Sequence, residues 1–362
     1  MSKIGKKKTR IMRKKVVIGL SGGVDSAVSA LLLKKQGYDV IALFMKNFED
    51  TDGTCPAQQD LDDVALTCKT LKIPFYTVNF VKEYREHVFN EFLADCQKGL
   101  TPNPDILCNK QIKFHYFYEK AMELGADYIA TGHYCQTEKI NSTFLLKKGA
   151  DPNKDQSYFL YAINPDTLRN VLFPIGHLTK PEVRQIAQEN DIPVFNKKDS
   201  TGICFIGKRN FKQFVSQYIG FTPGDILTVD GKKVGKHDGL AYHTLGQRKG
   251  LGVGGEGDAW YVVDKNIEKN EVIIGQGKNH PALFKKILRA NDLNWFKEPS
   301  FFPFLCRAKV RYRQIDQPCE IVSIHNGEVI VNFKEPQRAI TPGQSIVFYQ
   351  GEICLGGGKI QS

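Results

Sequence analysis

The stretch V-V-I-G-L-S-G-G-V-D-S at residues 16–26 constrains the fold of this chain most. Its apolar start, Val16–Leu20, predicts a buried strand, Ser21–Gly23 predict a tight turn, and Asp25–Ser26 begin a predicted helix that runs to Gly37. Glycine lets the backbone approach an anion, and a helix start offers unpaired N–H groups. The stretch lacks the lysine of the G-x-x-x-x-G-K-[ST] loop of kinase-type enzymes. It therefore predicts a different phosphate-binding turn, with an ordinary βα turn as the alternative.

The six letters S-G-G-V-D-S resemble the PP-loop of ATP pyrophosphatases. That family transfers AMP to a carbonyl-like oxygen and releases pyrophosphate. The resemblance implies that ATP is bound at this turn.

Further apolar runs follow at 39–45, 75–80 and 127–131, and each predicts a strand. Helical spacing or composition predicts helices around 61–71, 84–96 and 112–124. Strands that alternate with helices predict an α/β fold with a doubly wound parallel sheet. Ligands of such sheets lie beyond the carboxyl ends of the strands, where Ser21, Met45 and Gly132 are expected.

Charge and cysteine content limit the partners and the compartment. The net charge of +11 and the pI near 9.0 favour a polyanionic partner, without deciding between RNA, DNA and anionic lipid. No run of eighteen apolar residues occurs, so no membrane span is expected, and the basic tail 1–15 lacks the apolar core of a secretory signal. The nine cysteines form no C-x-x-C pair, which argues against a zinc ribbon. We expect a cytoplasmic monomer with mostly reduced cysteines.

The segment T-P-N-P-D-I-L-C-N at 101–109 combines two prolines with a carboxylate and a thiol. If Asp105 and Cys108 lie on one helical turn, their side chains share a face. A cysteine with a purely structural role is the alternative.

Several motifs together resemble the tRNA-specific 2-thiouridylase family. They are T-P-N-P-D-I-L-C-N, A-T-G-H (130–133), K-D-Q-S-Y-F-L (154–160), D-S-T-G-I-C-F-I-G (199–207), H-T-L-G-Q-R-K-G-L-G (243–252), V-R-Y-R-Q (310–314) and T-P-G-Q-S (341–345). The likeness covers nearly the whole chain beyond the basic tail.

Glycine spacing and turn signals predict the domain organisation. A PP-loop catalytic domain is expected at 16–210, a small β-rich tRNA-binding domain at 211–280, and an antiparallel β-barrel at 281–362. Asn326–Gly327 between two apolar runs predicts a hairpin turn. Alternating Arg307, Lys309, Arg311 and Arg313 predict one strand with a basic face, either solvated or in contact with RNA.

The resemblance implies ATP-dependent 2-thiolation of the wobble uridine of tRNAs for Lys, Glu and Gln, through adenylation of uracil O2. Cys204 would carry a persulfide received from a sulfur-relay protein or a cysteine desulfurase, and Cys108 would release the sulfur. Asp105 is assigned a general acid/base role, with a loop-capping carboxylate as the alternative. Mg²⁺ is expected from the chemistry alone, because no metal-binding motif is present.

The binding residues implied by the resemblance fall into three groups. ATP contacts are Gly19, Leu20, Ser21, Gly22, Gly23, Val24, Asp25, Ser26, Met45 and Gly132. Base contacts are Asn103, Pro104 and Asp105. The tRNA contacts are His133, Lys154, Asp155, Gln156, Arg311, Tyr312 and Gln344.

Two other functions compete with this one. Another PP-loop adenylating synthetase would need neither cysteine, and a non-catalytic tRNA-binding protein would leave the catalytic residues unexplained. Pyrophosphate release that depends on tRNA separates all three.

Overall fold

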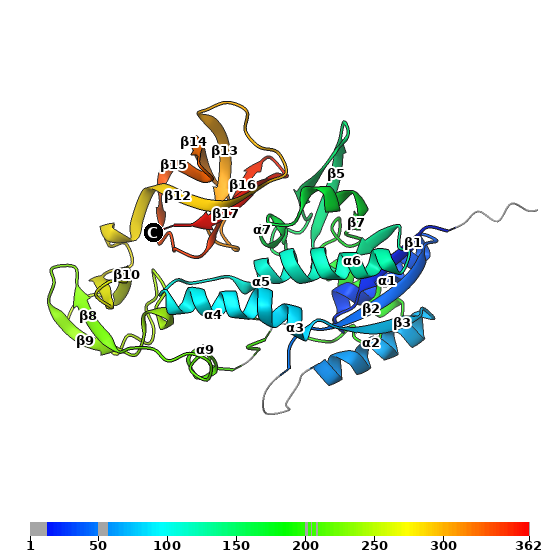
Figure 1. Ribbon diagram of the computed structural model, residues 1–362, viewed down its shortest axis with the longest axis horizontal. Helices are drawn as coiled ribbons and strands as arrows, with labels where there is room; N and C mark the ends of the chain where they lie inside the picture. The colour runs from blue at the N-terminus through cyan, green and yellow to red at the C-terminus, as the bar shows by residue number, and fades with distance from the viewer. Residues whose placement is uncertain (1–12, 50–56, 200–201, 204, 208, 362) are drawn as a thin grey trace, which may run out of the picture.

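A computed structural model of the chain describes residues 13–49, 57–199, 202–203, 205–207 and 209–361. Its strands form three sheets: a parallel sheet in the first part of the chain, a four-stranded sheet in the middle part, and a barrel in the C-terminal part that also includes a hairpin from the first part (Figure 1). The positions of Cys55, Cys204 and most of the basic tail lie outside the described residues.

The first sheet is parallel, as predicted, with the order β3-β2-β1-β4-β7. Its strands are β1 (Lys15–Gly19), β2 (Asp39–Lys46), β3 (Phe75–Asn79), β4 (Tyr128–Ala130) and β7 (Val171–Leu172). In β1, Val16 and Ile18 belong to one hydrophobic cluster and Val17 to another. Side chains alternate between the faces of a strand, so both faces of the sheet are buried.

Helices cover the two faces of this sheet. Buried side chains of α1 (Val24–Lys35), α2 (Ala57–Leu71) and α8 (Lys180–Glu189) share the cluster of Val16. Those of α4 (Asn90–Gln97) and α6 (Phe117–Glu123) share the cluster of Val17. The predicted doubly wound arrangement is confirmed. Shorter helices are α3 (Val81–Tyr84), α7 (Ser157–Leu160) and α9 (Phe211–Val215).

The segment around Cys108 is more helical than its prolines indicate. The loop ends at Asn103, α5 (Pro104–Leu107) follows, and a π-helical stretch, Cys108–Tyr116, continues into α6. Pro104 is compatible with this because proline is tolerated at the first position of a helix, where its missing N–H costs nothing. The prediction that the helix begins at Ile112 is wrong by two turns.

The middle part forms a four-stranded sheet with the order β10-β11-β8-β9. Its strands are β8 (Gly224–Thr228), β9 (Lys233–His237), β10 (Trp260–Asn266) and β11 (Glu271–Gln276). The prediction that this part of the chain is rich in β-strands is therefore confirmed.

The C-terminal part is a closed antiparallel barrel, as predicted. Its strands are β12 (Phe284–Trp295), β13 (Phe304–Lys309), β14 (Gln317–His325), β15 (Glu328–Arg338), β16 (Ser345–Gln350) and β17 (Ile353–Ile360). β12 pairs with both β15 and β17, which closes the barrel. Asn326 and Gly327 both have positive φ, as the predicted hairpin turn requires.

A hairpin from the first part of the chain extends this barrel. β5 (Cys135–Ile140) and β6 (Thr143–Lys148) pair with each other, and Lys147 of β6 is opposite Ile353 of β17. The barrel and the parallel-sheet domain are thus joined by strand pairing. Sequence reasoning did not predict this connection.

The predicted basic strand is wrong. β13 ends at Lys309, so Arg311 and Arg313 lie in the turn that follows it. Lys309 is not solvated either: it lies on the face of β13 opposite to Ala308 of the barrel core, and its buried ammonium pairs with the carboxylate of Asp155 at 3.0 Å. Arg307 pairs with Asp316 at 2.9 Å. These cations stabilise the barrel and do not form one solvated face.

Candidate active site

The turn between β1 and α1 is held by two serine side chains. The Ser21 backbone N–H donates to Ser26 Oγ at 3.3 Å, and Ser26 Oγ donates to the Gly23 carbonyl at 3.1 Å. Gly22 has φ +73°, a conformation that favours glycine. Gly23 precedes α1 without a side-chain cap, so the first amides of this helix have no capping side chain. The geometry agrees with the predicted phosphate-binding turn.

Two of the predicted ATP-contact glycines are needed by the fold itself. A Cβ on Gly22 would meet the Asp60 carbonyl oxygen at 2.7 Å, and a Cβ on Gly132 would meet the Ser26 nitrogen at 2.7 Å. A Cβ on Gly19 would lie 3.1 Å from the Met45 side chain. The ends of β1, β2 and β4 therefore meet at this turn, as expected for a parallel sheet.

Lys180 connects the turn to a distant motif. Its ammonium lies 2.7 Å from Asp25 Oδ1 and 2.8 Å from Asp199 Oδ1. Tyr134 also donates its hydroxyl to Asp25, at 2.7 Å. Asp199 begins the segment D-S-T-G-I-C-F-I-G that contains Cys204. One lysine thus bridges the start of α1 and the start of the segment with the predicted persulfide carrier.

Asp199 is surrounded by cations. Lys154 and Arg184 contact it at 2.6 and 2.9 Å, besides Lys180. Burial opposes ionisation of this carboxyl, but hydrogen bonds from Lys154 and Lys180 outweigh it and lower the pKa of Asp199 to about 2. Sequence reasoning missed Tyr134, Lys180, Arg184 and Asp199 as parts of the site. No short motif joins them, because the connection forms only in three dimensions.

Asp105 and Cys108 lie on consecutive turns of one helical run, as expected from their spacing. The side chain of Asn103 accepts a hydrogen bond from the Asp105 N–H at 3.2 Å and caps the helix. Burial raises the pKa of the Asp105 carboxyl, and Lys113 partly offsets this. Cys108 is 4% exposed and belongs to the main hydrophobic cluster. The structure therefore places a carboxyl with a raised pKa one turn before a buried thiol.

Both accessory domains hold the loop that leads to this helix. Lys265 of β10 donates to the Gly99 carbonyl at 2.9 Å. From the barrel, the Pro342 carbonyl accepts from Thr101 N–H at 3.1 Å, and the Gln344 side-chain amide donates to the Thr101 carbonyl at 2.6 Å. In Figure 1 this part of the chain runs from α4 to α5 alongside the barrel. Gln344, predicted to contact tRNA, is thus a loop anchor in this structure.

The neighbours of Cys204 are anchored in the same core as Cys108, although Cys204 itself lies outside the described residues. Phe205 is 3% exposed, and its ring centroid lies 5.2 Å from that of Phe92 and 5.3 Å from that of Phe89. Phe205 and Cys108 belong to one hydrophobic cluster. Any large movement of Phe205 would have to take its ring away from these aromatic neighbours.

Several residues predicted to contact tRNA make internal contacts. His133 is buried, its Nδ1 pairs with Thr131 Oγ1 at 2.8 Å, and burial lowers its pKa well below the usual value. Asp155 accepts from the Ser157 N–H and from Lys309, at 3.1 and 3.0 Å.

Three other residues that were predicted to contact tRNA also make contacts within the protein. Gln156 Oε1 accepts from the Tyr134 N–H at 3.0 Å. The guanidinium of Arg311 donates to the carbonyls of Leu245 and Ala339 at 3.0 and 2.8 Å. The ring of Tyr312 packs 4.3 Å from that of Phe159 between centroids. Each of these contacts supports the fold, and the role in tRNA binding stays a prediction.

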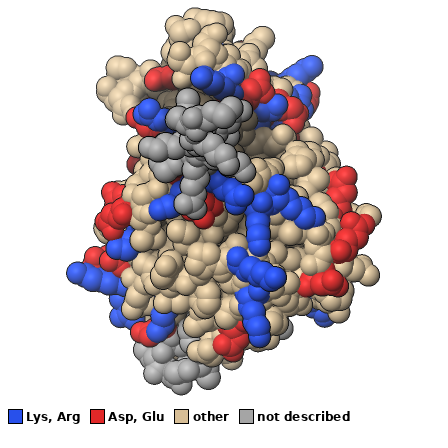
Figure 2. All heavy atoms as spheres, turned by 90° about the vertical axis from the view of Figure 1, so that its right-hand side faces the viewer, with Lys and Arg blue, Asp and Glu red and all other residues tan. Residues whose placement is uncertain are grey.

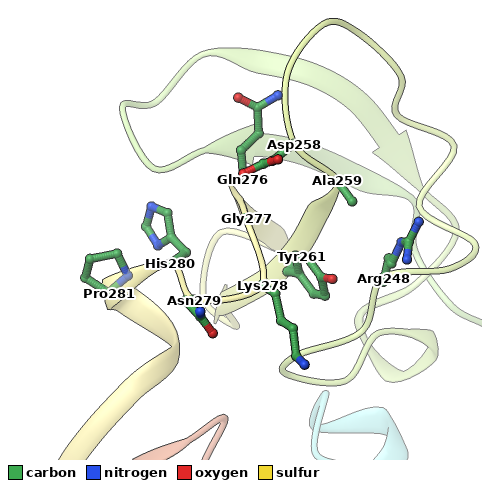
Figure 3. A pocket seen from close by; sticks show the side chains of 10 residues that line it. All are labelled: Arg248, Asp258, Ala259, Tyr261, Gln276, Gly277, Lys278, Asn279, His280 and Pro281. Carbon is green, nitrogen blue, oxygen red and sulfur yellow. The ribbon is translucent and has the colours of Figure 1, made fainter.

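A cavity of about 570 Å³ lies in the middle domain, and its charged lining residues are Arg248, Lys278 and Asp258. Figure 3 shows Arg248 and Lys278 on either side of Tyr261 within it. The guanidinium of Arg338 lies 5.4 Å from the centroid of the same ring. Arg248 comes from the glycine-rich segment H-T-L-G-Q-R-K-G-L-G at 243–252. A tyrosine ring with two cations in the cavity is a chemistry that could bind an RNA phosphate or base, although the Asp258 carboxylate opposes it and Arg338 donates to the Lys278 carbonyl.

The wider surface also carries positive charge. Figure 2 shows lysine and arginine side chains grouped in the middle of one face, with acidic side chains toward its edges. Across the part of the chain that the structure describes, no cluster of three or more His, Cys, Asp or Glu side chains could hold a metal ion. The same residues contain no helix long and apolar enough to cross a membrane.

Three family profiles match the chain in succession. They are described as a tRNA methyl transferase HUP domain at residues 14–208, a tRNA methyl transferase PRC-barrel domain at 212–276, and an aminomethyltransferase β-barrel domain at 285–360. The parallel sheet, the middle sheet and the closed barrel thus define a protein with one HUP domain and two β-domains.

Comparison with similar proteins identifies the family to which the chain belongs. The tRNA-specific 2-thiouridylase MnmA of Protochlamydia amoebophila is 58% identical over 96% of this chain and 94% of its own length. Those of Halalkalibacterium halodurans and Shouchella clausii are 55% and 53% identical, over 96% of this chain and 94% and 96% of theirs. The chain belongs to the tRNA-specific 2-thiouridylase family.

Proposed function

We propose that this protein catalyses ATP-dependent 2-thiolation of the wobble uridine in tRNAs for Lys, Glu and Gln. Family membership supports the thiolation of tRNA, and the bridge from Asp25 through Lys180 to Asp199 is the observation that carries the mechanism. This bridge ties the proposed ATP site to the segment of the proposed sulfur carrier. A phosphate-binding site and a sulfur site in one enzyme fit an adenylation followed by a thiolation.

The first step activates a poor leaving group. Uracil O2 attacks the α-phosphate of ATP, pyrophosphate leaves, and C2 then bears an adenylated oxygen. The turn at Ser21–Ser26 and the first amides of α1 would hold the phosphates of ATP. Mg²⁺ would be bound mainly through these phosphates, because the described residues supply no cluster of protein ligands. No step is assigned to the metal.

The second step delivers sulfur. A persulfide on Cys204, received from a sulfur-relay protein or a cysteine desulfurase, is attacked by the Cys108 thiolate. The S–S bond of the persulfide breaks, hydrosulfide leaves, and a Cys108–Cys204 disulfide remains for a reductant to open. The hydrosulfide then attacks C2, and AMP departs with the original oxygen. In the direct alternative, the terminal persulfide sulfur attacks C2 first and AMP departs; the Cys108 thiolate then breaks the S–S bond to Cys204, which gives the thiolated base and the same disulfide.

Asp105 is the proposed acid/base beside these groups. Burial raises the pKa of the Asp105 carboxyl above that of an ordinary aspartate. A carboxyl with a raised pKa is better suited to general acid/base catalysis, because its pKa lies closer to the working pH. Asn103 and Pro104 position Asp105 by capping and starting the helix. The location of Asp105 one turn before Cys108 supports a shared site for base and sulfur.

The middle domain offers two candidate cations for contact with tRNA. Arg248 and Lys278 line the cavity around Tyr261, whereas Arg311 donates to backbone carbonyls. We assign the first contact with RNA phosphates to this cavity.

The test is release of pyrophosphate from ATP with and without tRNA, together with mass analysis of the tRNA nucleosides. We expect release that requires tRNA and a thiolated wobble uridine when a persulfide donor is present. Release without tRNA would favour another adenylating synthetase. No release, with tRNA still bound, would favour a non-catalytic binding protein.

A further inference from the structure

Two cysteines outside the proposed active site lie opposite each other on neighbouring strands of the barrel. Cys306 of β13 and Cys319 of β14 are direct partners in the antiparallel register. Their sulfur atoms lie 3.6 Å apart. Residues that face each other in this way project their side chains to the same side of the sheet. In Figure 1, β13 and β14 lie next to each other in the barrel.

We propose that Cys306 and Cys319 are an oxidation site at which a hydroperoxide forms an intramolecular disulfide. In a disulfide the two sulfur atoms lie about 2.05 Å from each other, and the two Cβ atoms lie about 3.8 Å apart. Directly opposite residues of an antiparallel pair have Cβ atoms about 4.5–5.5 Å apart, so side-chain rotation and a small approach of the two strands would close the bond.

The two sulfurs have different roles in this reaction. Cys306 is partly exposed, whereas Cys319 is 5% exposed inside the barrel. The hydrogen bond with Cys306, followed by burial, raises the pKa of Cys319. Cys306 is therefore the sulfur that a peroxide in solution meets first, and Cys319 is the resolving thiol.

The steps balance without any group from the active site. The Cys306 thiolate attacks one peroxide oxygen, the O–O bond breaks, and a sulfenic acid and hydroxide form. Cys319 then attacks the sulfenic sulfur, the S–S bond forms, and the sulfenic oxygen leaves as water. Two thiols and one hydrogen peroxide thus give one disulfide and two waters.

The other described cysteines outside the proposed active site are poor competitors. Cys68, Cys96, Cys135 and Cys354 are 2%, 1%, 0% and 0% exposed. Burial raises the pKa of Cys68 to about 11 and that of Cys96 to about 12, so few thiolates form there. The oxidation is expected to be selective for the barrel pair among these six residues.

The disulfide would close the loop that carries Arg311 and Tyr312. This loop already contacts the rest of the protein through Arg311 and the carbonyls of Leu245 and Ala339. A covalent link at its base would restrict it further, because a cross-link removes conformations from the chain.

The test uses the reduced full-length protein, treated with hydrogen peroxide, alkylated and digested with trypsin. Arg307, Lys309, Arg311 and Arg313 separate the two cysteines, so a disulfide appears as two linked peptides. We expect this linked pair after peroxide and its loss on reduction. Cys68 serves as an internal control: when the protein is denatured for the alkylation, Cys68 should be alkylated with and without peroxide.

A Cys306→Ser variant should give no link and leave Cys319 open to alkylation once the protein is denatured. The link should persist in a Cys108→Ser variant, which separates it from any disulfide of the catalytic cycle. Alkylation of both barrel cysteines after peroxide would overturn the proposal. A sulfinic acid on Cys306 without a link to Cys319 would overturn it too.

Discussion

The side-chain amide of Gln344 in the barrel donates a hydrogen bond to the backbone carbonyl of Thr101, 2.6 Å away. Two residues after Thr101, Asn103 caps the helix of Asp105 and Cys108. Lys265 of the middle domain donates to Gly99 in the same loop. The position of the proposed catalytic helix thus depends on contacts from both β-domains.

Removal of the Gln344 amide should slow catalysis more than it weakens ATP binding. Gln344→Ala deletes one hydrogen bond, worth about 1 kcal/mol, and a roughly fivefold fall in kcat is expected if it positions the loop. Single-turnover thiolation and ATP affinity are the measurements. Gln361→Ala is the matched control, because Gln361 donates to Asn291 and to the Lys359 carbonyl, away from this loop. Equal rates for the two variants would remove Gln344 from the positioning of the loop.

The depressed pKa of Asp199 predicts a specific pH dependence of stability. An aspartate with a pKa of about 2 in the folded protein and 3.8 as the ordinary value stabilises the fold above about pH 4, and this contribution is lost as pH falls through 2. Asp199→Asn should lower the free energy of unfolding by about 1–2 kcal/mol at pH 7.

The difference between wild type and Asp199→Asn should shrink between pH 4 and pH 2. Urea unfolding at a series of pH values measures it. A constant difference over this range would mean that Asp199 ionises normally in the folded protein.

Binding of tRNA should depend on salt, and the middle domain should contribute to that dependence. Each lost phosphate contact reduces the slope of log K against log salt by about one, so Arg248→Ala with Lys278→Ala should reduce it by about two. Arg289→Ala is the control, because Arg289 pairs with Glu328 on the barrel. An unchanged slope in the double variant would exclude the cavity as a phosphate site.

The parallel sheet could be predicted because its signals are local. Val16–Leu20 is apolar on both faces of a strand, and Gly37 ends the first helix with φ +88°. The capping box of Thr179 and Glu182 is equally local, with Thr179 N–H donating to Glu182 at 2.7 Å. Such elements depend only on residues that are close in the sequence, so they can be predicted from the sequence alone.

The long-range contacts could not be predicted in the same way. Lys180 lies 155 positions from Asp25, and Gln344 lies 243 positions from Thr101. The alternation Arg307–Arg313 fits a strand locally, yet β13 ends at Lys309, whose buried ammonium pairs with Asp155. Charge spacing alone does not distinguish a solvated cation from one that binds its own protein.

The predicted role of Gly22 shows the same limit. Glycine is required there by the contact with Asp60 as well as by its positive φ, so replacing it would disturb the fold before it tested ATP binding. Cys108 and Cys204 give a cleaner test of the mechanism, because neither residue is assigned to the binding of ATP or tRNA.

The measurement that tests the central claim most directly is mass spectrometry of Cys108→Ser and Cys204→Ser after exposure to a persulfide donor, with thiolated tRNA measured in parallel. Cys108→Ser should carry a persulfide on Cys204, release pyrophosphate with tRNA, and fail to thiolate. Cys204→Ser should carry no persulfide and fail to thiolate, and both should still bind ATP and tRNA. Thiolation by Cys108→Ser at the wild-type rate, or a persulfide found on Cys108 alone, would contradict the account.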